Sequence, residues 1–236
     1  MASVRDPKII VALDHLNITQ TKALVTQLNP EECRLKVGVT LFTHYGPTLI
    51  AALMKSGFEI FLDLKFHDIP QQVAGACSAA ADLGVWMMNV HIQGGRAMLE
   101  SAYHALAKTH FPNKPLLIGV TVLTSFDDGD LQAIGVQEKI AVLVPRFAKL
   151  AQEVGLDGVV CSPHEVSTLR AQFKKDFLLV TPGIRPAGGT QHDQKRIMTP
   201  QAAMMAGSSY LVIGRPITDA ADPASALRRI NAEIQV

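Results

Sequence analysis

Eight short apolar segments recur along the chain, and their spacing constrains the fold more than any other feature. They are rich in β-branched residues and begin at residues 9, 35, 60, 86, 116, 158, 178 and 211. The starts lie roughly 30 residues apart, which is the length of one strand–helix unit. Eight such units in about 250 residues predict an α/β fold of the (β/α)8 (TIM) barrel type. We expect a single barrel domain over residues 1–236.

The element boundaries follow from the same pattern. We expect strands at 9–13, 35–39, 60–64, 86–90, 116–123, 158–161, 178–181 and 211–214. Helical spacing of apolar residues predicts helices at 19–28, 47–56, 70–83, 97–110, 138–154, 166–173, 200–206 and 223–234. An open doubly wound sheet is the alternative. It is disfavoured because the first strand ends in Ala12-Leu13-Asp14-His15 and lacks the glycine-rich turn of that fold.

Composition excludes several classes of partner. Lys and Arg number 22 against 21 Asp and Glu, and no run of like charge stands out. Neither nucleic acid nor an anionic membrane surface is therefore expected as a partner. No apolar run is long enough to span a bilayer, and the N-terminus has no apolar signal segment. Three cysteines without metal-ligand spacing suit a reducing compartment, so we expect a soluble cytoplasmic protein.

The third strand ends in an unusual run of charges, Asp63-Leu64-Lys65-Phe66-His67-Asp68-Ile69-Pro70. Residues two apart on a strand share a face, so Asp63 and Lys65 point the same way, and Asp68 can fold back from the loop. Charges on a buried strand carry a desolvation cost. Either they form a structural ion pair, or they serve a functional site.

Polar residues also occur at the ends of most other expected strands, where the active sites of such barrels lie. They are Asp14, Lys36, Asn89, His91, Thr124, Ser125, Ser162, Arg185 and Arg215. Such a distribution indicates one convergent site. We interpret His67 and His91 as structural hydrogen-bonding residues rather than bases.

The loops after the seventh and eighth strands predict a phosphate site, which recurs there in these barrels. Gly183 and Gly214 allow close backbone approach, and Arg185 and Arg215 offer planar donors that suit phosphate. The polar, glycine-rich segment 186–191 has the composition of a lid over a phosphorylated ligand, and Gln194 is near enough in sequence to reach the phosphate.

With these residues in place, the chain resembles the orotidine 5′-monophosphate decarboxylases in their bacterial form. The resemblance runs from residue 11 to 217 and rests on Val11-Ala12-Leu13-Asp14, Leu35-Lys36-Val37-Gly38, the run from Asp63 to Pro70, Asn89-Val90-His91, Val120-Thr121-Val122-Leu123-Thr124-Ser125, Thr181-Pro182-Gly183-Ile184-Arg185-Pro186, Asp193-Gln194-Lys195-Arg196 and Gly214-Arg215-Pro216-Ile217. Ile92-Gln93 departs from the family, which often has smaller residues there.

The resemblance implies decarboxylation of orotidine 5′-monophosphate to UMP and CO2, the last step of UMP synthesis, without metal or organic cofactor. It also implies a homodimer with shared active sites. The catalytic residues that it implies are Lys36, Asp63, Lys65 and Asp68. Lys65 would protonate C6 of the pyrimidine, and Asp68 would serve the partner's site.

The resemblance also implies the substrate contacts. Asp14 and Lys36 match positions that bind the ribose hydroxyls, and Asp63 lies beside the substrate carboxylate. Thr124 and Ser125 match the pyrimidine side. The phosphate-side positions are Arg185, Gln194, Gly214 and Arg215.

Two other functions stay open at this point. A related metal-dependent decarboxylase of 3-keto-gulonate 6-phosphate shares the Asp-x-Lys-x-x-Asp core but carries a glutamate ligand on the second strand. Here Lys36 occupies that strand, and an ammonium group does not bind Mg²⁺. A non-catalytic phosphate-binding barrel is the second alternative, although binding alone does not require three charges at one strand end.

Overall fold

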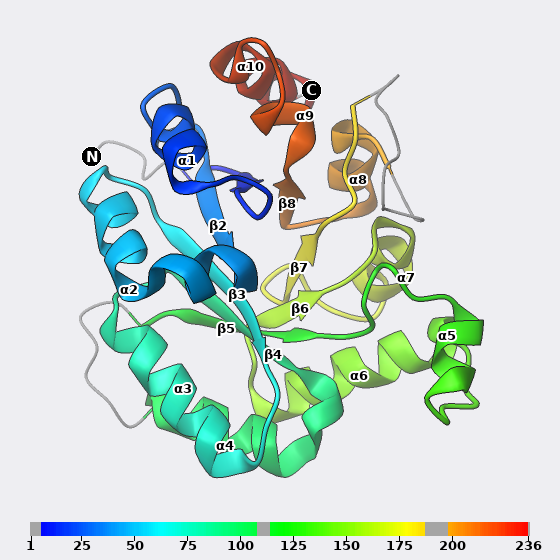
Figure 1. Ribbon diagram of the computed structural model, residues 1–236. Helices are drawn as coiled ribbons and strands as arrows, with labels where there is room; N and C mark the ends of the chain where they lie inside the picture. The colour runs from blue at the N-terminus through cyan, green and yellow to red at the C-terminus, as the bar shows by residue number, and fades with distance from the viewer. Residues whose placement is uncertain (1–5, 108–113, 187–197, 236) are drawn as a thin grey trace.

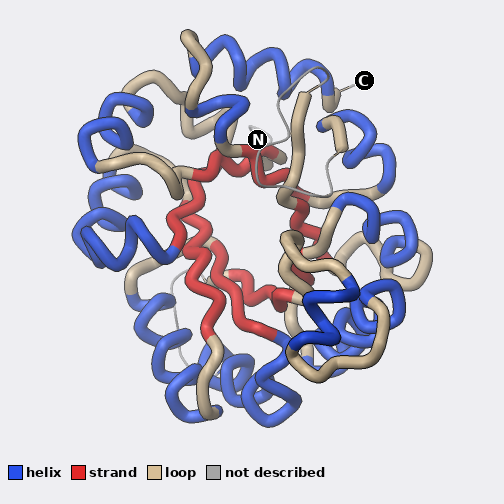
Figure 2. Tube along the Cα trace, turned by 45° about the vertical axis from the view of Figure 1, so that its right-hand side comes forward, coloured by secondary structure: helices blue, strands red, loops and turns tan. Residues whose placement is uncertain are grey.

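The computed structural model describes residues 6–107, 114–186 and 198–235, which build a closed barrel of parallel strands (Figures 1 and 2). Each strand pairs with the next, and the last pairs with the first, so the predicted TIM barrel is confirmed. The strands are β1 (Ile9–Ala12), β2 (Arg34–Gly38), β3 (Ile60–Phe66), β4 (Met87–His91), β5 (Leu116–Val120), β6 (Gly158–Val160), β7 (Leu178–Thr181) and β8 (Tyr210–Ile213).

Helices surround the barrel and cover its outer face (Figure 2). They are α1 (Ile18–Val25), α2 (Val39–Lys55), α3 (Pro70–Asp82), α4 (Gly95–Ala107), α5 (Asp128–Ala133), α6 (Ile140–Val154), α7 (Val166–Arg170), α8 (Pro200–Ala206), α9 (Arg215–Thr218) and α10 (Pro223–Glu233). Two 3₁₀ turns, Ile92–Gly94 and Pro163–Glu165, lead into α4 and α7. Among the described residues, no helix combines the length and the apolar composition needed to cross a membrane.

Some boundaries differ from those predicted. The strand expected at 116–123 ends at Val120, and the chain then turns, with the amide of Phe126 donating to the carbonyl of Leu123 at 2.9 Å. Helix α2 begins at Val39, eight residues before Pro47, and is kinked at Gly46, whose φ of 56° is not helical. The helix predicted at 47–56 matches the segment that follows this kink. The short helices α5 and α9 were not predicted.

Apolar side chains form two layers, one on each face of the strands. The outer layer packs between the strands and the helices. The inner layer fills the barrel interior below the C-terminal ends of the strands. It consists of Ile10, Phe61, Met87, Ile118, Val180, Tyr210 and Val212. Parallel strands covered on both faces read as continuous apolar runs, which is why the sequence identified them.

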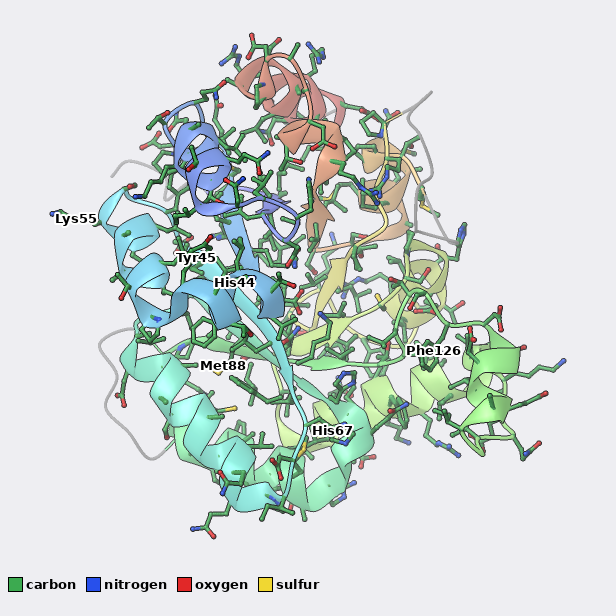
Figure 3. The ribbon with its side chains drawn as sticks, in the orientation of Figure 1. His44, Tyr45, Lys55, His67, Met88 and Phe126 are labelled. Atoms are coloured by element: carbon green, nitrogen blue, oxygen red, sulfur yellow. The ribbon has the colours of Figure 1, made fainter. Side chains whose placement is uncertain are left out.

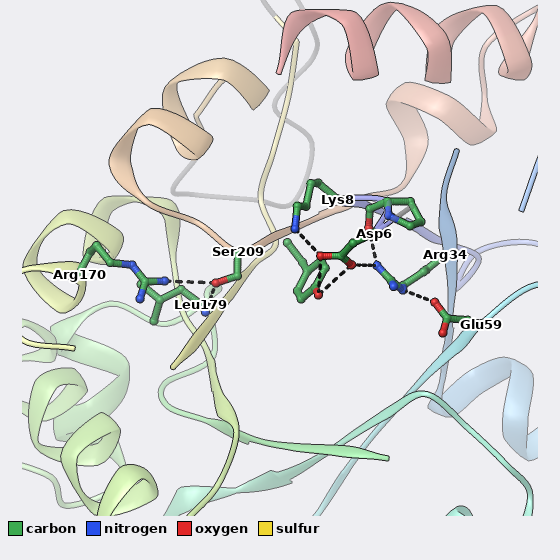
Figure 4. A network of polar contacts seen from close by, with 9 residues as sticks. Asp6, Lys8, Arg34, Glu59, Arg170, Leu179 and Ser209 are labelled. Carbon is green, nitrogen blue, oxygen red and sulfur yellow. Dashed lines mark hydrogen bonds and ion pairs between the residues drawn. The ribbon is translucent and has the colours of Figure 1, made fainter. Parts of the chain in front are cut away.

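Arg34 closes the N-terminal end of the barrel. Its guanidinium donates to Asp6 at 2.8 Å and to Glu59 at 2.7 Å (Figure 4), and it stacks 3.9 Å from the ring centre of Trp86. The side chain of Arg34 is 6% exposed, whereas its two carboxylate partners remain about half exposed. With this end filled, the free space inside the barrel lies at the C-terminal ends of the strands.

Candidate active site

A cavity of ≈ 470 Å³ opens at the C-terminal ends of the strands. That volume suits a small molecule of nucleotide size. Inward-facing apolar residues form its floor, including Phe61, Val120, Val160 and Val212. The polar groups that line it are Asp14, His15, Lys36, Asp63, Lys65, Thr124, Arg185 and Arg215, together with the backbone of Gly183 and Gly214. Most of the residues predicted from separate strand ends therefore meet in one place.

Four of these residues form a line of alternating charge across the ends of β1, β2 and β3. Lys36 Nζ lies 2.5 Å from Oδ2 of Asp14 and 2.7 Å from Oδ2 of Asp63. The other oxygen of Asp63, Oδ1, lies 2.7 Å from Lys65 Nζ. Gly38 leaves room for this line, because a Cβ there would lie 1.8 Å from Oδ1 of Asp14.

Burial is graded along the line. The side chains of Lys36 and Asp63 are 8% and 10% exposed, whereas that of Lys65 is 36% exposed. Two buried ions thus support one ammonium group that faces the cavity and remains in reach of solvent.

The charges of this line hold one another in the ionised state. Burial alone raises the pKa of Asp63, but the ammonium groups of Lys36 and Lys65 outweigh it and bring that pKa well below the usual range. Burial likewise lowers the pKa of Lys36, and the carboxylates of Asp63 and Asp14 more than reverse this, so the pKa is raised. The two buried members of the line, Asp63 and Lys36, are therefore both charged at neutral pH.

Lys65 lies in a distorted part of its strand. It is the one non-glycine residue with positive φ, 51°, in the part of the chain that the structure describes. The pairing of β3 with β4 shifts register between Leu62 and Phe66, which marks a bulge. A left-handed backbone at a non-glycine residue costs about 1–3 kcal/mol, and such residues cluster at functional sites.

The opposite end of the cavity carries two arginines. The side chain of Arg185 is buried and donates from Nη1 to the carbonyl of Ile184 at 2.8 Å. Its Nε is buried without a hydrogen-bond partner among the described residues. Burial lowers the pKa of Arg185, and the positive charge of Arg215 lowers it further. Two guanidinium groups that repel each other beside an open cavity provide a site for an anion.

Two of the residues predicted to bind substrate or to act in catalysis lie elsewhere, and a third is outside the described residues. Ser125 is exposed and does not line the cavity. Asp68 does not fold back towards Lys65 in its own chain: its carboxylate is exposed and accepts a hydrogen bond from the amide of Ile69 at 2.6 Å. Gln194, with most of the expected lid at 186–191, lies outside the described residues.

Two further residues take part in the site: His15, which was not predicted there, and Asn89, which was predicted only as a polar residue at a strand end. His15 lines the cavity, and its Nε2 lies 2.9 Å from Oγ1 of Thr218 and 3.1 Å from Oδ1 of Asp219. This contact joins the loop after β1 to helix α9. Asn89 is fully buried and contacts both Asp63 and Lys65. In the sequence, Asn89 was recognisable as an amide residue within an apolar run predicted to be a buried strand.

The two histidines near Lys65 contact each other with their rings tilted. His67 lies in the loop after β3 (Figure 3), and its ring centre is 5.4 Å from that of His91. Burial lowers the pKa of His91, and the neighbouring His67 and Lys65 lower it further, so the ring is neutral. The described residues contain no cluster of three or more His, Cys, Asp or Glu side chains suited to a metal ion.

Comparison with known proteins gives a consistent result. The model of the "Orotidine 5'-phosphate decarboxylase / HUMPS family" matches residues 7–230. A relative from Coxiella burnetii named orotidine 5′-phosphate decarboxylase is 57% identical over 230 residues, which is 98% of each chain. One of the same name from Psychromonas ingrahamii is 53% identical over 231 residues, again 98% of both.

Solved structures agree with these relatives. The crystal structure of orotidine 5′-phosphate decarboxylase from Lactobacillus acidophilus superposes with a TM-score of 0.87 at 40% identity, covering 98% of this chain and 100% of that one. The enzyme of the same name from Pyrococcus horikoshii, at 24% identity, covers 97% of this chain and 99% of that one with a TM-score of 0.76, a likeness of fold. The chain therefore belongs to the orotidine 5′-phosphate decarboxylase / HUMPS family, and it is a carboxy-lyase.

Proposed function

We propose that the chain converts orotidine 5′-monophosphate to UMP and CO2 in pyrimidine biosynthesis, with Lys65 as the proton donor. The observation that carries this proposal is the line Asp14–Lys36–Asp63–Lys65, which presents one ammonium group to the cavity. The names of the relatives and the two arginines at the other end support the choice of substrate.

The proposed chemistry needs a fixed cation beside C6 of the pyrimidine. The bond from C6 to the carboxylate breaks, CO2 leaves, and the electron pair stays on C6 in the ring plane, where the π-system does not delocalise it. An ammonium group stabilises this carbanion as it forms and then transfers a proton to C6. Lys65 is left as a neutral amine and regains a proton from water, to which its partial exposure gives access.

Asp63 holds the ammonium groups of both lysines in place. Its two oxygens bind one ammonium each, Lys36 on one side and Lys65 on the other. Its negative charge also lies beside the position that the substrate carboxylate would take next to Lys65. Crowding of two carboxylates would favour loss of CO2, and we give it a secondary role.

The rest of the substrate would span the cavity. Asp14 and Lys36 would bind the ribose hydroxyls, and Thr124, which lines the cavity, would contact the pyrimidine. The phosphate would bind at Arg185, Gln194, Gly214 and Arg215. Since the phosphate does not react, its binding energy is available to order the reacting end of the substrate.

A homodimer would complete the site through Asp68. The carboxylate of Asp68 is exposed in its own chain, and the adjacent Ile69 is 63% exposed although it is apolar. In such a dimer a second copy of the chain would cover both side chains. Asp68 of that copy would then flank Lys65 from the side that Asp63 leaves open.

The metal-dependent alternative is disfavoured by the position of Lys36. Its ammonium bridges Asp14 and Asp63, so the two carboxylates are already paired with a cation that belongs to the protein. Mg²⁺ requires oxygen ligands free to coordinate it.

The proposal is tested by mixing the protein with orotidine 5′-monophosphate in excess EDTA and following the loss of pyrimidine absorbance. Turnover without metal supports it. Failure under these conditions, with Mg²⁺-dependent turnover of a sugar phosphate instead, would replace it with the metal-dependent reaction. Tight binding of UMP without turnover of either substrate would indicate the non-catalytic barrel.

A further inference from the structure

Strand β3 carries two more residues than β4 along the stretch that leads to Lys65. Leu62 pairs with Met88 and Phe66 pairs with Val90, so three residues of β3, at 63–65, lie opposite the single residue Asn89. An insertion of this kind interrupts the backbone ladder and leaves amide groups without their strand partners.

Asn89 compensates for this interruption with its side chain. Its Oδ1 accepts a hydrogen bond from the backbone amide of Lys65 at 2.8 Å, and its Nδ2 donates to Oδ1 of Asp63 at 2.7 Å. The orientation of the amide is settled by chemistry, because a backbone N–H can only donate and an ionised carboxylate can only accept. The residue is fully buried, so both bonds are shielded from water.

The two bonds act on different parts of the catalytic line. The bond to Lys65 holds the backbone of a residue whose φ of 51° is otherwise disfavoured. The bond to Asp63 orients the carboxylate so that Oδ1 meets Lys65 while Oδ2 meets Lys36. We propose that Asn89 is a positioning residue of the decarboxylation site, which holds Lys65 in its left-handed conformation and aims its ammonium group into the cavity.

This inference rests on the proposed function, and it concerns a residue that does not line the cavity. If Asn89 only filled the core, its loss would lower stability and leave the chemical step unchanged. If it positions Lys65, its loss lowers kcat while ligand affinity is kept, since the phosphate-side residues lie on other strands.

Two variants separate the two bonds. Asn89→Ala removes both. Asn89→Asp keeps the size and the acceptor for the amide of Lys65, but its ionised form no longer donates to Asp63. Thr121→Val is the matched control, because Thr121 is equally buried and its hydroxyl donates to the carbonyl of Val160 at 2.9 Å, away from the line of charges.

The measurements are kcat for orotidine 5′-monophosphate, the Kd for UMP and the thermal midpoint. We expect Asn89→Ala to lower kcat by about 100-fold, since a shift of about 1 Å in a reacting group has that effect, and to change the Kd for UMP by less than about threefold. Thr121→Val should lower the midpoint and leave kcat unchanged.

A pH profile gives a second, independent readout. As pH falls, the carboxylate introduced by Asn89→Asp takes up a proton. Its O–H group can then donate a hydrogen bond to Asp63, as the amide of Asn89 does, so kcat relative to wild type should rise towards acidic pH. Asn89→Ala should show no such recovery. The charged and titratable groups around this position are Asp63, Lys65, Lys36 and His91, and all are retained in both variants.

The outcomes separate this inference from the proposed function. A wild-type protein that does not decarboxylate orotidine 5′-monophosphate overturns the proposed function. Given an active wild type, an unchanged kcat in both Asn89 variants, with only the midpoint lowered, overturns the positioning role. If Asn89→Ala does not fold, the near-isosteric Asn89→Asp decides by its pH profile, and a profile parallel to wild type contradicts the inference.

Discussion

The ammonium group of Lys36 lies 2.7 Å from Oδ2 of Asp63, the carboxylate whose other oxygen binds Lys65. One buried carboxylate is thus shared by two lysines from different strands. This contact explains the run of charges at the end of β3, because Lys36 and Asp14 continue the line of ion pairs across the mouth of the barrel. The carboxylate and the ammonium groups offset each other's cost of burial.

Arg215 should contribute to capture of the substrate more than to its reaction. For Arg215→Ala we expect KM for orotidine 5′-monophosphate to rise by about 100-fold, with a smaller fall in kcat, because a charged hydrogen bond to phosphate is worth roughly 1.5–3 kcal/mol. Steady-state kinetics with Arg146→Ala as the control checks this, since Arg146 is an exposed arginine of α6 that pairs with Glu138. An unchanged KM in Arg215→Ala would exclude Arg215 from the phosphate site.

Sharing of Asp68 between subunits predicts complementation. Lys65→Ala and Asp68→Ala should each be inactive alone. When the two are mixed and allowed to exchange subunits, half of the dimers are hybrids with one intact site, so activity should recover to about a quarter of wild type. Unmixed Lys65→Ala at the same concentration is the control. No recovery, with exchange verified by mass, would contradict the sharing of Asp68.

Arg34 should stabilise the barrel without affecting catalysis. Arg34→Met removes two ion pairs and the stacking on Trp86, and we expect it to lower the free energy of unfolding by about 1–3 kcal/mol. Its distance from the cavity predicts an unchanged kcat. Unfolding in guanidinium chloride checks the predicted loss of stability, and the decarboxylation assay checks the unchanged kcat. A large loss of kcat in a folded variant would show coupling between the barrel ends.

Two buried thiols should make the fold sensitive to alkali. Burial raises the pKa of both Cys33 and Cys77 from 9.0 to about 12. The unfolded chain therefore loses these protons near pH 9, while the folded chain keeps them until about pH 12, so the free energy of unfolding falls as pH rises through this window.

The slope contributed by each thiol approaches about 1.4 kcal/mol per pH unit. Denaturant unfolding under reducing conditions at about pH 8 and about pH 10, compared with the double variant Cys33→Ala/Cys77→Ala, isolates this contribution. The double variant should lose less stability between the two conditions. An equal loss in both proteins would show that the thiols do not cause the alkaline sensitivity.

The sequence predicted the barrel because each strand is buried on both faces and so reads as an apolar run of five or so residues. It also predicted Asp14, Lys36, Asp63 and Lys65 at strand ends, and the structure brings these four into contact. Helix α9 was missed because it has four residues, too few for helical periodicity to show.

Other features depend on contacts between distant segments. The left-handed backbone of Lys65 arises from the register of β3 against β4, which no local pattern encodes. The role of Asn89 follows from the same register. The exposure of Asp68 could not be derived either, since the short loop after β3 is equally compatible with a carboxylate that turns back to Lys65.

The central claim is that Lys65 supplies the proton to C6, and single-turnover kinetics of Lys65→Ala tests it most directly. The variant should show no decarboxylation of orotidine 5′-monophosphate while still binding UMP, because the residues expected to bind phosphate and ribose are intact. Lys149→Ala, which removes an exposed lysine of α6, should behave as wild type. Turnover near the wild-type rate in Lys65→Ala would contradict the account.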